Sequence, residues 1–86
     1  MTIQKELVKR EIAGDTILVP VGQTVYETNG LFILNELGSF LWDRLTGAED
    51  EEALLQAVLA EYEVSREVAL ADIREFLDNL RKQGII

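Results

Sequence analysis

The chain has 86 residues, no cysteine, no histidine and a net charge of −8 at neutral pH. Its 48% hydrophobic and 28% charged residues are typical of a folded globular domain, and its length allows only one core. We therefore expect a single domain over residues 1–86. The missing side chains exclude thiolate chemistry, the usual neutral-pH acid–base group and the commonest zinc ligands. We expect neither catalysis nor a bound cofactor.

The charge and the apolar pattern also argue against nucleic-acid and membrane partners. The eight basic residues are scattered along the chain, and sixteen acidic residues would repel a phosphate backbone. No apolar run approaches the roughly 18 residues that span a bilayer, and the N-terminus does not resemble a signal peptide. A cytoplasmic location is the expectation, and nothing indicates an oligomeric state.

Three short β-prone segments occupy the first part of the chain. Residues 7–13 (LVKREIA) and 16–21 (TILVPV) are separated by Gly14-Asp15, which suits the tight turn of a two-residue hairpin. Residues 21–30 form a connection, with one extended turn of chain around Val25 and Tyr26. The apolar residues 31–34 (LFIL) predict a third strand. The result is a three-stranded antiparallel sheet.

Three helices are predicted after the sheet, each with a capping residue. Asn35 begins the first, which Gly47 ends, and Asp50 begins the second. Ser65 begins the third and longest, which Gly84 ends. Each helix carries an apolar stripe at helical spacing. The apolar tail of residues 85–86 is expected to pair or pack against the sheet. The predicted fold class is α+β and winged-helix-like.

Three polar or aromatic features could mark a site, and each has a simpler explanation. Residues 49–52 (EDEE) could hold a hard cation, but acidic residues at a helix N-terminus are stabilised by the helix dipole without a metal. Ser39 lacks a histidine partner, which leaves only a lysine as a base. Trp42 lies beside the apolar stripe, where core packing is more common than ligand binding.

A mixed row on the third helix is the sharper candidate. Leu70, Arg74, Leu77 and Arg81 follow one another at i, i+4, i+7 and i+11, so two leucines alternate with two arginines. Such a row would suit an acidic amphipathic peptide. On spacing alone, the alternative is stronger: the leucines enter the core, and the arginines form a solvated border paired with Glu67 or Asp78.

The sequence resembles one family nearly from end to end. REIAGDTILVPVG, then NGLFILNELGSFLWDRLTG, EYEVS and ALADIREFLDNLRKQGII are similar to the PqqD family of peptide chaperones. These domains are also called recognition elements for ribosomally made, post-translationally modified peptides. The resemblance runs from about residue 7 to the C-terminus. Its most specific parts are LNELGSFLW at residues 34–42, Gly47, and the D-x-x-x-F-L-x-x-L spacing over residues 72–80.

The resemblance implies a non-catalytic domain that binds the leader of a precursor peptide. It presents that leader to a modifying enzyme, often a radical S-adenosylmethionine maturase, which we expect to be a separate chain. The leader is expected to add as a strand to the third β-strand and to place its side chains against the third helix. The expected peptide-binding residues are Leu31, Phe32, Ile33, Leu34, Leu70, Arg74, Leu77 and Arg81.

Two other functions remain open at this stage. A winged-helix DNA-binding or regulatory domain has the same arrangement of helices. However, the outer face of the third helix carries Glu67, Glu75, Asp78 and Asn79 among its cations, which is unfavourable for reading DNA. A purely structural subunit of a larger complex would use the same surfaces, and the sequence does not separate it from a peptide-binding module.

Overall fold

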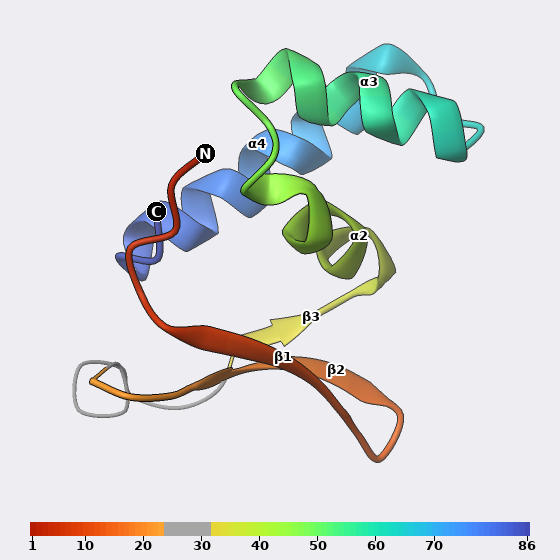
Figure 1. Ribbon diagram of the computed structural model, residues 1–86. Coiled ribbons are helices and arrows are strands. Elements are labelled where there is room, and N and C mark those ends of the chain that lie inside the picture. The colour runs from red at the N-terminus through yellow and green to blue at the C-terminus, as the bar shows by residue number, and fades with distance from the viewer. Residues whose placement is uncertain (24–31) are drawn as a thin grey trace.

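The computed structural model describes residues 1–23 and 32–86, and in this part of the chain a three-stranded sheet precedes three helices (Figure 1). The sheet is antiparallel with the order β1-β2-β3, which confirms the predicted α+β, winged-helix-like class. The elements are β1 (Leu7–Ile12), β2 (Asp15–Pro20), β3 (Phe32–Leu34), α2 (Glu36–Leu45), α3 (Glu51–Glu61) and α4 (Arg66–Lys82). The expected connection around Val25 and Tyr26, and Leu31, lie outside the described residues.

The first hairpin turns one residue earlier than the sequence predicted. Ile12 pairs with Asp15, so the two loop residues are Ala13 and Gly14 rather than Gly14 and Asp15. Their φ angles of 52° and 85° are those of a type I′ turn, whose twist matches that of the flanking strands. The turn requires positive φ at both central positions, and Gly14 supplies the second of them without steric cost.

One face of the sheet packs against the helices. Leu18 pairs with Phe32, and both contribute to the apolar interior, Leu18 with no exposed surface. Leu34, two residues after Phe32, is also buried. Ile33 lies between them and is 68% exposed, because successive side chains of a strand point to opposite faces. β3 therefore anchors itself by two side chains and leaves the third outside.

All three predicted N-caps are confirmed. The side chains of Asn35, Asp50 and Ser65 accept hydrogen bonds from the backbone N–H groups three residues further on, at 2.7, 2.9 and 3.2 Å. The predicted stop of the last helix is confirmed as well. Gly84 adopts φ 71°, and the N–H of Ile85 donates to the carbonyl of Leu80 at 2.9 Å, which closes the helix end.

The core lies mainly among the helices. It joins buried side chains of α2, α3 and α4, and Ile85 belongs to it. The C-terminal tail thus packs into the helical core, and the Ile85 carbonyl accepts a hydrogen bond from the N–H of Gln4, in the segment before β1. Trp42 is half-buried against the same cluster. None of the helices in the described part of the chain has the length and apolar character that crossing a membrane requires.

One polar link ties the sheet to α2. The ammonium of Lys9 on β1 donates to both carboxylate oxygens of Asp43, at 2.6 and 2.7 Å, and to the Ser39 hydroxyl at 3.0 Å. Lys9 is mostly buried, and its apolar stem crosses from the inner face of the sheet to the helix. Ser39 therefore accepts a hydrogen bond from an ammonium group, which has donors only and cannot take a proton from it.

Candidate functional site

A groove of about 560 Å³ opens between β3 and α4. All three residues of β3 line it: Phe32, Ile33 and Leu34. The facing wall comes from α4, with Asp72, Glu75, Phe76 and Asn79. These positions are spaced i, i+3, i+4 and i+7, so one face of the helix supplies the whole wall.

The floor of the groove is apolar and comes from α2. Leu37, Gly38 and Leu41 lie there, between the two walls. A Cβ atom at Gly38 would stand 3.4 Å from Leu34 Cδ2 and 3.5 Å from Phe76 Cε1, so a longer side chain would project between the walls. The glycine thus leaves the floor open between Leu34 of the strand and Phe76 of the helix.

A backbone edge adjoins this groove. β3 pairs with β2 through Thr16–Leu34, Ile17–Ile33 and Leu18–Phe32 and, within the residues that the structure describes, no strand covers its other side. An uncovered edge presents N–H and C=O groups that an extended peptide can pair with. The site therefore combines a hydrogen-bonding edge with an apolar floor.

A second hollow continues the groove past the end of β3. It measures about 470 Å³ and shares Asp15, Leu34 and Asn35 with the first. Glu11, next to the hairpin, and Glu36, in the first turn of α2, also line it. The two hollows together give an elongated surface that suits an extended chain better than a compact small molecule.

The structure places the predicted site residues in two separate regions. Phe32, Ile33 and Leu34 line the groove, as a strand-addition site needs. The row from α4 does not line it. Leu77 is fully buried in the core and Leu70 is half-buried against it, whereas Arg74 and Arg81 are exposed and lie outside the groove. Their role in peptide binding stays a prediction.

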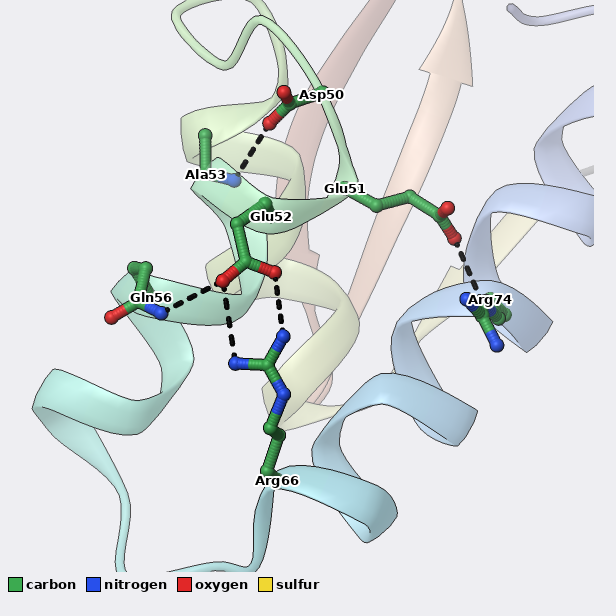
Figure 2. Close-up of polar contacts among 7 residues, drawn as sticks. All are labelled: Asp50, Glu51, Glu52, Ala53, Gln56, Arg66 and Arg74. Carbon is green, nitrogen blue, oxygen red and sulfur yellow. Dashed lines mark hydrogen bonds and ion pairs between the residues drawn. The ribbon is translucent and has the colours of Figure 1, made fainter.

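The arginines of α4 are used in ion pairs. Arg66 binds Glu52 at 2.9 Å and Arg74 binds Glu51 at 3.3 Å, and both pairs join α4 to α3 (Figure 2). Arg81 binds Asp78 on its own helix at 3.4 Å. The acidic run at residues 49–52 therefore contributes a helix cap and two ion pairs.

Sequence reasoning missed the groove-facing side of α4. Asp72 and Phe76 appeared only as parts of the family's D-x-x-x-F-L-x-x-L spacing, and Glu75 and Asn79 only as parts of a polar outer face. The signal was present, because Phe76 is flanked at helical spacing by Asp72 and Asn79. It could be read only once the position of β3 relative to the helix was known.

The comparisons with known proteins agree with this geometry. The family model for coenzyme PQQ synthesis protein D (PqqD) matches residues 18–86. The chain belongs to the PqqD family. A solved structure of TbiB1 in complex with the TbiA(beta) leader peptide is similar, with 27% sequence identity and a TM-score of 0.74. The match covers 99% of this chain and 93% of that one. No curated protein matched the sequence.

The family resemblance predicted from the sequence is thus confirmed, and with it the PqqD-like order of elements. The alternative of a winged-helix DNA-binding domain is not favoured. Among the described residues that line the groove there are aspartates and glutamates but no lysine or arginine, so this surface would repel a phosphate backbone.

Proposed function

We propose that this PqqD-family chain binds the leader segment of a ribosomally made precursor peptide and presents it to a separate modifying enzyme. The enzyme class that the family resemblance implies is a radical S-adenosylmethionine maturase. The chain itself contributes binding and no catalysis. A protein of similar structure, TbiB1, has been solved with a leader peptide bound, and this supports the proposal.

The observation that carries the proposal is the position of the groove beside the uncovered edge of β3. An extended leader that pairs with β3 would form a fourth strand, and every second side chain would face α4. The side chains of Phe32 and Leu34 already fill the interior behind the strand. The leader side chains that face inward would therefore meet the floor at Gly38 and the ring of Phe76.

Backbone pairing alone is too weak to account for a stable complex. β3 has three residues, which offer only a few hydrogen bonds at its edge. Each contributes about 0.5 to 1.5 kcal/mol net, whereas a micromolar complex needs about 8 kcal/mol after the cost of association. Side chains in the groove must supply most of the affinity. We propose that Phe32, Ile33 and Leu34 contribute from the strand and Phe76 from the helix.

The polar contacts fit a binding role better than a catalytic one. The Ser39 hydroxyl accepts a hydrogen bond from the Lys9 ammonium, which also pairs with Asp43. Within the described residues, the side chain that contacts this hydroxyl is therefore a donor and not a base that could activate it. The groove contains carboxylates and amides on a solvated rim, without the buried, converging groups that acid–base catalysis requires.

The direct test is titration with the leader of the precursor peptide encoded beside the gene for this chain. Calorimetry should give a dissociation constant in the micromolar range or below. Amide chemical shifts should change most in β3 and in the middle of α4, and least in α3. A scrambled leader of the same composition serves as control. Binding confined to α3, or no preference over the scrambled peptide, would contradict the proposal.

A further inference from the structure

The rim of the groove carries negative charge without counter-charge. Asp72 and Glu75 lie on the α4 wall, Asp15 at the hairpin end, and Glu11 and Glu36 around the second hollow. All five carboxylates are exposed, and within the described residues none of them is paired with a cation. In the part of the chain that the structure describes, no lysine or arginine lines either hollow. An occupant of the groove would therefore experience a negative field from several sides.

The two sides of α4 differ in charge. Arg66 and Arg74 point to α3, where Glu52 and Glu51 neutralise them. Asp72 and Glu75 face the groove instead. Because Arg66 and Arg74 are engaged with α3, they do not offset these two carboxylates. Charge on α4 is thus segregated between a neutralised side and an acidic side.

From this arrangement, and resting on the proposed function, we propose that the groove selects leader segments in which a lysine or arginine lies two positions from a large apolar residue. The apolar side chain packs on Phe76 and the floor, and the cation binds Asp72 and Glu75. Segments with aspartate or glutamate in that place are rejected. This is opposite in sign to the acidic partner that the arginines of α4 suggested from sequence.

The two-residue spacing proposed for the leader follows from the rise per residue of a strand and of a helix. Residues i and i+2 of a strand point to one face and lie about 6.6 Å apart, while four residues of helix advance about 6 Å. Asp72 and Phe76 are four residues apart on α4. In a leader strand that runs along α4, two neighbouring inward side chains can therefore reach both residues, one by charge and one by apolar contact.

The effect of Asp72 and Glu75 on leader affinity is limited, because both carboxylates are exposed to solvent. Ion pairs between solvated groups are weak, so the two carboxylates should change affinity by roughly three- to tenfold rather than determine it. Discrimination against an acidic leader should be larger, because repulsion adds to the lost attraction. The carboxylates thus act mainly on specificity.

A random dodecapeptide library displayed on phage tests the proposal without a known ligand. Wild type and the Asp72→Asn/Glu75→Gln variant are each used as bait. The enriched sequences are then made as synthetic peptides with lysine, serine or glutamate at the position two residues from the apolar one. The control variant, Glu63→Gln/Glu67→Gln, removes two exposed carboxylates outside the groove. Circular dichroism checks the fold of all three proteins.

We expect wild type and control to enrich peptides with a basic residue two positions from an apolar one. Fluorescence anisotropy should show three- to tenfold weaker binding of the lysine peptide to the groove variant, and 0.5 M salt should reduce the preference of wild type. Enrichment of apolar peptides without a basic preference would overturn this inference and leave the proposed function standing. Failure to enrich any peptide over a blank support would overturn both.

Discussion

Arg74 donates from Nε to Oε1 of Glu51 at 3.3 Å and so joins α4 to α3 (Figure 2). Neither residue lines the groove. Together with the Arg66–Glu52 pair, this contact borders the apolar cluster that packs the last two helices against each other. Arg74, which the sequence spacing suggested as a peptide contact, therefore has an ion-pair partner, Glu51, within the chain.

Replacing Arg74 and Arg81 by glutamine should change leader affinity by less than about twofold. Both side chains lie outside the groove, and glutamine removes the charge without adding repulsion. Unfolding in urea should show a loss of about 1 kcal/mol or less, because exposed ion pairs contribute little. Calorimetric titration of the leader checks the affinity. A tenfold loss in a folded variant would place these arginines in the site, as the sequence suggested.

The second prediction concerns the carboxyl group of Glu52. Its pKa is lowered chiefly by the hydrogen bond from Arg66, and further by the one from Gln56. The pKa of Glu52 is lower in the folded than in the unfolded state. The ion pair with Arg66 therefore stabilises the fold fully at pH values above the ordinary pKa of a glutamate. The contribution is lost as the pH falls through the folded pKa. Arg66→Gln should raise the pKa of Glu52 and reduce the change of the free energy of unfolding with pH in this acidic range.

Carbon-detected NMR titration of the Glu52 carboxyl measures this shift directly. Arg81→Gln is the matched control, because it removes an arginine from the same helix that does not contact Glu52. The Glu52 pKa should be unchanged in that control. If Arg66→Gln and Arg81→Gln shift it equally, the general field of α4 rather than the hydrogen bond would be the cause.

The third prediction concerns the link between β1 and α2. Replacing Lys9 by methionine keeps the apolar stem but removes three donated hydrogen bonds, to Ser39 and to both oxygens of Asp43. The bonds are charge-assisted, but Asp43 is half-exposed, so we expect a loss of about 1 to 2 kcal/mol in the free energy of unfolding. Lys82→Met, at the exposed end of α4, should have almost no effect. Equal midpoints in urea for both variants would contradict this.

Local signals predicted the elements of the fold, and the arrangement between elements was harder to predict. Asn35, Asp50 and Ser65 each cap a helix because their short polar side chains reach a nearby backbone N–H, an interaction within four residues of sequence. The one-residue error in the hairpin arose because Gly14-Asp15 and Ala13-Gly14 both contain a glycine. Only the register of Ile12 with Asp15 decides between them.

The sequence indicated the strand residues that line the groove but not the helix residues that face them, and their role in binding stays a prediction. A short apolar run after a glycine indicated β3, and the family resemblance indicated its use. Which side of α4 faces β3 depends on how the three helices pack through a shared buried cluster, whose members, such as Leu41, Leu54 and Ile73, are far apart in sequence. Phe76 and Asp72 could not be assigned to the groove without that packing.

The last prediction compares two exposed isoleucines, one in the groove and one outside it. Ile33 on β3 is 68% exposed and lines the groove, while Ile12 on β1 is 56% exposed and lines neither hollow. Neither is part of the core, so alanine at either position should leave the fold intact. A leader strand beside β3 would cover Ile33, and losing its apolar contact should weaken binding by about 1 to 2 kcal/mol. That corresponds to roughly five- to thirtyfold in the dissociation constant.

Ile12→Ala should bind the leader as wild type does, because β1 forms the opposite edge of the sheet. Comparing the two variants by calorimetry separates strand addition at β3 from a general loss of surface hydrophobicity, since both changes remove the same three carbons from an exposed strand. Thermal denaturation of both proteins should show similar midpoints. If Ile12→Ala weakened binding as much as Ile33→Ala, the leader would have to contact both edges of the sheet or its outer face. The groove between β3 and α4 would then not be the principal site.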